Sequence, residues 1–564
     1  MARQQSLAVH LQSGASPIDK NQTFDAVIVG AGSAGAVLAA RLSENPDFSV
    51  ALIEAGPDYP TVDAIPDDIR LGNNFLTAVW GKHCRRYLAN ANDEQPEPAI
   101  IPRGVVTGGS SAVNPQIFLR GLPDDYDQWA KLGNDEWSFE KVLPYFKKIE
   151  KDLDFDGPHH GRSGNVPVRR IKRELWSRQS KAFYDSCVAL GVKEDPDANH
   201  PDSVGVGPRP LNNVDGVRIS TAIAYLNGAR SRPNLSIIPM ATASRIVFEG
   251  RRAVGVDLER AGGKDTIRGK RIILCGGVIG SPQLLLLSGV GPAKQLQGLG
   301  IPVVADLPGV GKNLKDHPAV ALLFQGKGKA PTAKEHCWQV GLRYTTEGSA
   351  ERGDMIFNLF AIPEGNYRQT IQHAKKRLRL SWWEILKCGV RPGRAFFTIS
   401  CCLQNPESSG ELTLASADPK AQPALHYRYL SSARDRERMR AGIRFMTRVA
   451  GHPTFVGSID APVVLPTDEM LANDGVMDRW MLRNVNTQQH SCGTCKMGPS
   501  SDPLAVVDQY GDVHGLEGLS VMDASAMPDI VRANINATVV MMAERAVQWL
   551  ARPAAVTAGK AGRA

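Results

Sequence analysis

The sequence of 564 residues predicts an α/β protein with two parts. One part is a parallel sheet assembled from segments far apart in the chain, and the other is a mostly antiparallel sheet covered by helices. Three observations predict this division. A strand, a glycine-rich turn, a helix and a second strand follow one another between residues 24 and 54. Strand and helix pairs return much later, and alternating apolar and polar runs between residues 325 and 480 are typical of antiparallel strands.

The first unit begins with residues 24–29, an apolar run rich in valine and isoleucine, as expected of a buried parallel strand. The turn that follows has the sequence Gly30-Ala31-Gly32-Ser33-Ala34-Gly35. Residues 36–43 continue as a helix, and a second strand over residues 49–53 ends at Glu54. This order of elements is the fingerprint of a dinucleotide-binding unit.

Each glycine of this turn has a separate expected role. Gly30 permits the tight turn, Gly32 lets the backbone approach a pyrophosphate, and Gly35 lets the helix pack closely on the strand. Glu54 is placed to accept hydrogen bonds from a ribose diol. Because this carboxylate disfavours a 2′-phosphate, the unit predicts FAD or NAD rather than NADP.

Later segments extend both parts of the fold. For the parallel sheet they are strands at residues 271–274 and 519–522 and helices at 281–287 and 538–549; for the antiparallel sheet they are runs at 395–403 and 411–414. Material inserted between distant segments of one sheet implies a discontinuous domain.

Composition limits the class of protein. With 42% hydrophobic and 22% charged residues and a net charge of +8, the chain reads as globular and soluble, with no nucleic-acid footprint. No apolar run is long enough for a membrane span. Residues 1–20 lack the apolar core of a secretion signal and are expected to be a flexible leader. Residues 553–564 are expected to be a flexible tail. We therefore expect a cytoplasmic protein.

Nine cysteines, an odd number in a large chain, indicate a reducing compartment rather than a disulfide framework. Cys492 and Cys495 form a C-x-x-C pair, which leaves redox pairing open. A four-cysteine zinc site would need a second pair of cysteines. Cys401 and Cys402 are adjacent in sequence, which is not a spacing of the usual zinc modules, so no metal site is predicted.

Residues 371–387 form a basic amphipathic helix in this interpretation. Its charges and tryptophans are Lys375, Lys376, Arg377, Arg379, Trp382 and Trp383. A helix packed on the body or acting as a lid is favoured, because Trp382 shares a stripe with Leu378 and Ile385. Contact with a membrane surface is the alternative.

A second glycine-serine loop and several later motifs follow the fingerprint in order. They are Arg103 with Gly108-Gly109-Ser110-Ser111-Ala112-Val113-Asn114, then Arg120-Gly121, Gly280-Ser281-Pro282-Gln283-Leu284-Leu285, His490 with Gly493-Thr494-Cys495-Lys496-Met497-Gly498, and Asp523-Ala524-Ser525-Ala526-Met527-Pro528 before Asn536. Over residues 24–550 the chain resembles the glucose-methanol-choline oxidoreductases, a family of FAD enzymes.

The resemblance implies a site. His490 would accept the proton of an alcohol, Asn536 would bind the substrate oxygen, and the carbinol carbon would give a hydride to flavin N5. An imidazole can take a proton near neutrality, whereas an amide can only orient the oxygen. The residues expected at FAD are Gly30, Gly32, Ser33, Ala34, Gly35, Glu54, Ala55, Arg103, Gly108, Gly109, Ser110, Asn114, Ala243, Asp523, Ala524, Asn536 and Ala537. Val113 stands where some relatives have a histidine attached to the flavin, so non-covalent FAD is expected.

The resemblance also implies a domain division. Residues 21–155, 205–324 and 481–552 would form the FAD-binding domain, and residues 156–204 and 325–480 the substrate domain. Asn484, Asn486, Gln488 and Gln489 suggest polarity near the base. The expected partners are a small alcohol and an electron acceptor, either O2 or a quinone or another acceptor; the sequence identifies neither, nor the oligomeric state.

Three alternatives to alcohol oxidation use the same fold. A light-driven fatty-acid decarboxylase is disfavoured because His490 is present. A hydroxynitrile lyase would use FAD without net redox change. A non-catalytic flavin-binding protein is disfavoured because His490 and Asn536 are both intact.

Overall fold

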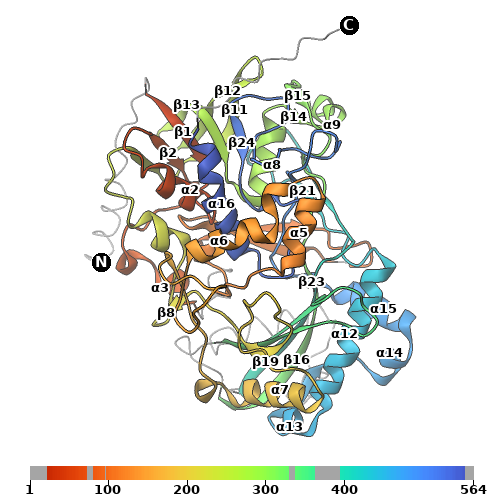
Figure 1. Cartoon of the computed structure of the whole chain (residues 1–564). Helices are drawn as coiled ribbons and strands as arrows, with labels where there is room; N and C mark the ends of the chain where they lie inside the picture. The colour runs from red at the N-terminus through yellow and green to blue at the C-terminus, as the bar shows by residue number, and fades with distance from the viewer. Residues whose placement is uncertain (1–21, 73–80, 96, 330–336, 363–393, 553–564) are drawn as a thin grey trace, which may run out of the picture.

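The computed structural model describes residues 22–72, 81–95, 97–329, 337–362 and 394–552 (Figure 1). The expected leader, the expected tail and the basic segment 371–387 lie outside these residues. In the described part, no helix is long and apolar enough to cross a membrane.

The first sheet is parallel at its centre, as predicted. Its order is β10-β2-β1-β13, with β24 also paired to β13. These strands are β10 (Leu235–Ile238), β2 (Val50–Ile53), β1 (Thr23–Val29), β13 (Gly263–Leu274) and β24 (Leu519–Val521), and every pair among them is parallel. The antiparallel strands β12 (Arg252–Arg260) and β11 (Thr242–Glu249) extend it beyond β13. The run from residue 26 to 28 is fully buried, which explains its uninterrupted apolar sequence.

Helices from both ends of the chain cover this sheet. The predicted helices are α2 (Gly35–Leu42), α8 (Gly277–Leu287) and α16 (Asn536–Leu550). Although about five hundred residues separate them, α2 and α16 lie side by side (Figure 1). A bond of 3.0 Å from Arg41 Nε to the buried Glu544 carboxylate joins the two helices. The discontinuous assembly expected from the sequence is therefore present.

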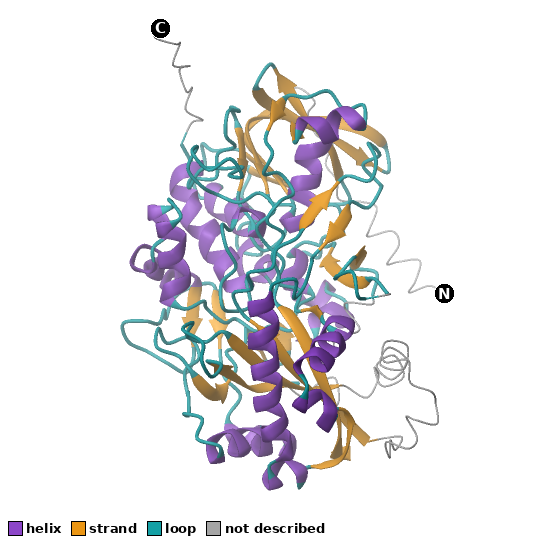
Figure 2. Cartoon of the chain, turned by 90° about the vertical axis from the view of Figure 1, so that its right-hand side faces the viewer, coloured by secondary structure: helices purple, strands orange, loops and turns teal. Residues whose placement is uncertain are grey.

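The second sheet is antiparallel and has the order β22-β16-β19-β18-β17-β7, with β23 paired to β16. Its strands are β22 (Ile459–Val464), β16 (Pro318–Lys329), β19 (Arg394–Leu403), β18 (Met355–Ile362), β17 (Trp338–Tyr344), β7 (Gly205–Pro208) and β23 (Asn486–Thr487). The helices α12 (Ala433–Gly451), α7 (Arg178–Ala189) and α13 (Pro453–Val456) pack together against it. Figure 2 shows these helices beside the lower sheet.

Two details differ from the sequence prediction. The run at 411–414 does not join the second sheet, because among the described strands β20 (Glu411–Thr413) pairs with β21 (Ala424–His426) alone. The predicted boundary after residue 324 falls inside β16, and β7 hydrogen-bonds to β17 in the second sheet. Both strands therefore belong with the substrate-side sheet, although the prediction grouped residues 205–324 with the FAD side.

The remaining elements connect these two sheets. They are α3 (Asp67–Arg70), β3 (Cys84–Ala89), β4 (Ala99–Gly104), α5 (Pro123–Lys131), α6 (Phe139–Ile149), β5 (Glu150–Asp152), β6 (Val166–Val168), β8 (Asn213–Val214), β9 (Val217–Arg218), β14 (Val290–Gly291), α9 (Ala293–Gly298), β15 (Ala305–Asp306), α14 (Asp468–Ala472) and α15 (Asp474–Asn484), with short single turns at 62–64, 109–112, 135–137, 173–175, 222–226 and 524–526.

Candidate active site

The first glycine loop has the geometry that its sequence predicts. Gly30 has a φ of 102°, and a Cβ there would lie 2.4 Å from the Cys275 carbonyl oxygen. A Cβ at Gly35 would lie 1.9 Å from the Gly30 oxygen, so only glycine fits both positions. A Cβ at Gly32 would meet nothing closer than the Gly109 Cα at 3.9 Å. The loop is therefore tightly packed at Gly30 and Gly35 and open at Gly32, where a pyrophosphate would lie.

The second glycine loop touches the first one. Gly108 donates a backbone hydrogen bond of 2.7 Å to the Ala31 oxygen, and a Cβ on Gly109 would lie 2.6 Å from the Gly32 Cα. Two loops distant in sequence thus form one cradle of backbone, with no side chain between Gly32 and Gly109. Such a cradle is suited to a diphosphate.

Glu54 closes this cradle at the end of β2. Its carboxylate accepts hydrogen bonds from the Ala31 backbone at 3.0 Å and from the Gly56 backbone at 2.9 Å. Burial raises the pKa of Glu54 to about 7, against the opposing effect of these hydrogen bonds. The side chain is thereby fixed in orientation beside the first loop.

A cavity of about 760 Å³ lies against both loops, within the size range of ligand sites. Of the residues predicted at FAD, it is lined by Gly30, Gly32, Ser33, Ala34, Glu54, Ala55, Arg103, Gly109, Ser110, Asn114, Ala243, Asp523, Ala524 and Asn536. Gly35, Gly108 and Ala537 stand behind the lining. Val113 also lines the cavity, where its hydrocarbon side chain offers no nucleophile to a flavin. The open cradle, the anchored acid and the size of the cavity all fit FAD.

His490 lies in the wall of the same cavity. Its Nε2 is 2.9 Å from Nδ2 of Asn534, and its Nδ1 is 2.9 Å from Nδ1 of His317. Burial and the nearby Arg103 charge lower the pKa of His490 to about 3. Burial also lowers the pKa of His317 well below its usual value. The pair is therefore two neutral imidazoles at neutral pH, and His490 is in the form that can accept a proton.

Asn536, predicted to bind the substrate oxygen, is hydrogen-bonded to the first glycine loop, and Asn534 is the asparagine bonded to His490. The Asn536 side-chain oxygen accepts a bond of 2.8 Å from the Ser33 hydroxyl in the first glycine loop. Asn536 is the first residue of α16, whereas Asn534 lies in the preceding loop that passes His490. The asparagine side chain beside the base is therefore that of Asn534, two residues before the predicted one, while Asn536 keeps a position at the nucleotide loop.

Asp316 holds the histidine pair from behind. One of its oxygens accepts from the backbone N–H of His490 at 2.9 Å and of His317 at 2.8 Å, and the other accepts from the Tyr429 hydroxyl at 2.8 Å and from the Thr487 hydroxyl. Burial raises the pKa of Asp316, and these hydroxyl bonds oppose the shift. Sequence reasoning missed Asp316, His317 and Asn534; the only signal for the first two was an Asp-His pair just before the apolar run of β16.

The polar residues expected near the base separate into two groups. Asn486, Gln488 and Gln489 line the cavity. Asn484 instead donates to the Trp480 carbonyl oxygen at 2.8 Å within α15. Cys492 and Cys495 are buried free thiols, whose pKa burial raises well above the usual value, so they are inert packing residues rather than a thiolate pair.

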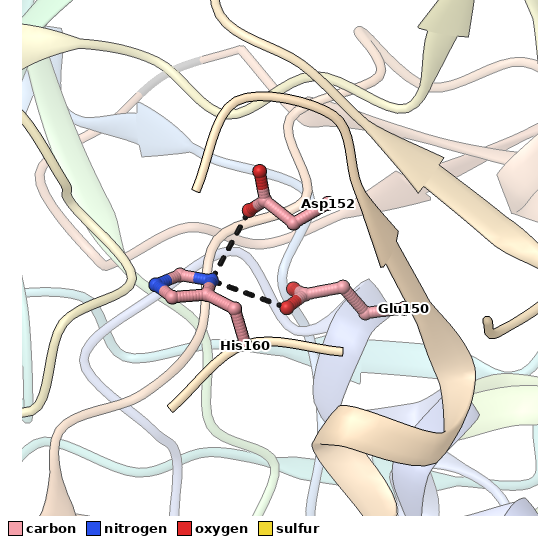
Figure 3. Close-up of side chains that lie close together, drawn as sticks. All are labelled: Glu150, Asp152 and His160. Atoms are coloured by element: carbon pink, nitrogen blue, oxygen red, sulfur yellow. Dashed lines mark hydrogen bonds and ion pairs between the residues drawn. The ribbon is translucent and has the colours of Figure 1, made fainter. Parts of the chain in front are cut away.

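A separate buried cluster, Glu150, Asp152 and His160, has the residue types of a metal site (Figure 3). His160 Nδ1 lies 3.1 Å from Asp152 and 3.2 Å from Glu150, and its Nε2 lies 2.8 Å from Asp197. Arg120 pairs with Glu150 at 2.6 Å, and Arg170 pairs with both aspartates. His160, Arg120 and Arg170 thus face the carboxylates of Glu150, Asp152 and Asp197, with Asp154 also 3.8 Å from Arg170. None of these residues lines the cavity. The cluster is a closed ion-pair network.

Comparison with known sequences matches this geometry to a family. Two family models described as GMC oxidoreductase match the chain, one over residues 24–319 and the other over residues 406–543. The chain belongs to the GMC oxidoreductase family.

Relatives in the family align over nearly the whole chain. The chain is 34% identical to an oxygen-dependent choline dehydrogenase of Vibrio vulnificus, covering 94% of each protein. It is 33% identical to a 5-(hydroxymethyl)furfural oxidase of Methylovorus sp., covering 93% of this chain and 97% of the relative. The crystal structure of pyridoxine 4-oxidase from Mesorbium loti superposes with a TM-score of 0.83 at 27% identity, covering 93% of this chain and 99% of that one.

These matches confirm the predicted fold and cofactor. This GMC oxidoreductase is an FAD-dependent enzyme that acts on CH–OH donors.

Proposed function

We propose that the enzyme oxidises an alcohol to an aldehyde or ketone, with His490 as the base that accepts the hydroxyl proton. The observation that supports this most directly is the neutral His490 ring in the cavity wall, with Nε2 turned to Asn534. Named relatives act on choline, 5-(hydroxymethyl)furfural and pyridoxine, each of which is an alcohol. When bound, FAD supplies the acceptor for a hydride from the carbinol carbon.

The hydrogen-bond pattern supports Nε2 as the nitrogen of His490 that accepts the proton. The Asn534 amide nitrogen is a donor, so Nε2 of His490 is unprotonated. The proton of the neutral ring is then on Nδ1, where it is donated to Nδ1 of His317. An alcohol entering between His490 and Asn534 would donate its hydroxyl proton to Nε2 and accept a hydrogen bond from the Asn534 amide. Asn534, rather than the predicted Asn536, would thus bind the substrate oxygen.

The test is anaerobic flavin reduction by a panel of alcohols in the parent enzyme and in His490→Ala. Loss of a general base should slow reduction by at least about a hundredfold while FAD stays bound. Because the pKa of His490 is about 3, the parent rate should stay level as pH falls from 8 to 5. The control is His426→Ala, an exposed histidine outside the cavity. An unchanged rate in His490→Ala would contradict the proposal, and admission of air afterwards distinguishes an oxidase from a dehydrogenase.

A further inference from the structure

The second sheet forms one wall of the cavity, and the register of its strands sets the order of side chains along that wall. Ala321 of β16 pairs with Ser400 of β19. Thr398 of β19 pairs with Phe360 of β18, which pairs with Trp338 of β17. All five residues line the cavity. Residues opposite one another on paired strands share a face, so the wall runs from small side chains to aromatic ones.

The end of this wall with small side chains is the end near the base. Gln488 donates a side-chain bond of 2.6 Å to the Ser400 hydroxyl, and its backbone N–H donates to the His317 oxygen at 3.2 Å. Ala319 of β16 pairs with Asn486, in the segment that leads to His490. A substrate hydroxyl at His490 is thus surrounded by amide and hydroxyl groups.

The other end of the wall is an aromatic stack. The rings of Trp338 and Phe360 have centroids 4.5 Å apart and an interplanar angle of 21°. Two residues along a strand span about 7 Å and neighbouring strands lie about 5 Å apart, so the stack begins about one ring length beyond Ser400. A planar group attached to the carbinol carbon would reach this stack.

The charges around the cavity disfavour a cationic substrate. Among the described lining residues the only carboxylates are Glu54 and Asp523, and neither is on the sheet wall. Glu54 is held by the first glycine loop, and Asp523 accepts from Gly277 N at 2.8 Å and from the Ser281 hydroxyl at 2.6 Å. The charged groups that remain are Arg85 and Arg103. Arg103 donates to the Gln489 carbonyl oxygen at 3.2 Å and to the Ser491 hydroxyl at 2.7 Å, on either side of His490. A cation beside the described residues of the sheet wall would be desolvated without a carboxylate next to it.

We propose that this site takes a neutral alcohol with a planar aromatic body and discriminates against alcohols with a quaternary ammonium group. The inference rests on the proposed function. Aromatic faces also attract quaternary ammonium groups, by about 0.5–2 kcal/mol. Here, however, Trp338 and Phe360 cover one face of each other, and two arginines share the cavity. Repulsion by these arginines, and the lack of a carboxylate among the described residues of the sheet wall, outweigh that attraction.

The test compares three alcohols in anaerobic rapid-mixing experiments with the FAD-bound enzyme. Benzyl alcohol supplies a planar ring, whereas choline and 3,3-dimethylbutan-1-ol have the same shape and differ only in charge. We expect kred/Kd for benzyl alcohol to exceed that for 3,3-dimethylbutan-1-ol by about tenfold, a factor that one aromatic contact supplies. The neutral isostere should in turn exceed choline by at least about tenfold.

Variants of the stack assign the preference to these residues. Trp338→Leu and Phe360→Leu should each lower kred/Kd for benzyl alcohol about tenfold and leave 3,3-dimethylbutan-1-ol within about threefold. Tyr344→Leu is the control, because Tyr344 is at the other end of β17, stacks on Phe445 at 4.2 Å and does not line the cavity. Binding of benzaldehyde to the oxidised enzyme, followed by flavin absorbance, should weaken in the first two variants only.

The outcomes separate this inference from the proposed function. The inference would be overturned if kred/Kd for choline equalled or exceeded the values for its neutral isostere and for benzyl alcohol. The alcohol mechanism would then still stand. Equal losses in the Trp338→Leu and Tyr344→Leu enzymes would overturn the assignment to the stack. Reduction by none of the three alcohols or of the wider panel would overturn the proposed function and the inference with it.

Discussion

Two asparagines separated by one residue face different parts of the cavity, and their substitution tests this difference. Asn534 lies 2.9 Å from the base, whereas Asn536 is bonded to Ser33. We expect Asn534→Ala to slow flavin reduction by about tenfold or more, since a donor to the developing alkoxide is lost. Asn536→Ala should change this rate less and raise the Kd for FAD, measured by flavin fluorescence on dilution. The reverse pattern would restore the role predicted from the sequence.

At the scale of residues, the sequence predicted side chains that belong to a recognisable motif. It did not predict side chains that reach the cavity only through the tertiary structure. His490 was identified because its surrounding run is distinctive. Asn534 was missed because the register at the start of α16 decides which asparagine faces the cavity, and that register is not visible in a single sequence. His317 and Asp316 precede a strand of the other sheet, so their contact with His490, more than 170 residues away, depends on the pairing of β23 with β16.

At the scale of elements, the predictions succeeded where periodicity and glycine chemistry act together. The strand ends near residues 29, 53 and 274 were predicted because buried parallel strands are continuous apolar runs. The run at 411–414 was assigned to the wrong sheet, since alternation indicates a strand but does not identify its partner. The predicted division at residue 324 falls within β16, because this strand continues past it without a change of composition.

The ion-pair network that joins β5 to the segment around Asp197 gives a prediction about stability and pH. Burial alone would lower the pKa of His160, but hydrogen bonds with Asp152, Asp197 and Glu150 outweigh burial and raise it to about 10. The unfolded value is about 6.5. Since the folded value is higher, the stabilisation is fully present below about pH 6.5 and is lost as pH rises through about 10.

We therefore expect His160→Gln to lower the thermal midpoint by a few degrees at pH 6 to 7, and the difference from the parent to shrink between pH 8 and 10.5. The groups that face His160 are Glu150, Asp152, Asp197, Arg120 and Arg170. His426→Gln, at an exposed position, is the matched control. A midpoint difference that does not change with pH would show that the ring acts through packing and not through its charge.

At the scale of the whole molecule, both ends of the described chain meet at the FAD cradle. The first glycine loop bonds to the start of α16 through Ser33 and Asn536, and α2 bonds to α16 through Arg41 and Glu544. The sequence predicted this discontinuity from the strand and helix pairs that return late in the chain, whereas the individual contacts are visible only in the structure. Ligands that bind only this assembled state stabilise it by about 2.7 kcal/mol at a hundred times their Kd.

Removal of FAD tests this coupling together with the proposed non-covalent attachment. Because Val113 offers no nucleophile, acid precipitation should release the yellow flavin into the supernatant, whereas flavin in the pellet would contradict non-covalent binding. The apoprotein should unfold at a lower temperature than the holoenzyme, and in the holoenzyme flavin release and loss of circular dichroism should coincide.

Glu544→Gln keeps the shape of a buried side chain but loses its charge toward Arg41 and Lys148, so it should lower the midpoints of flavin release and of unfolding equally. Flavin release well below the unfolding temperature would instead mean that the cradle opens locally while α2 and α16 stay packed.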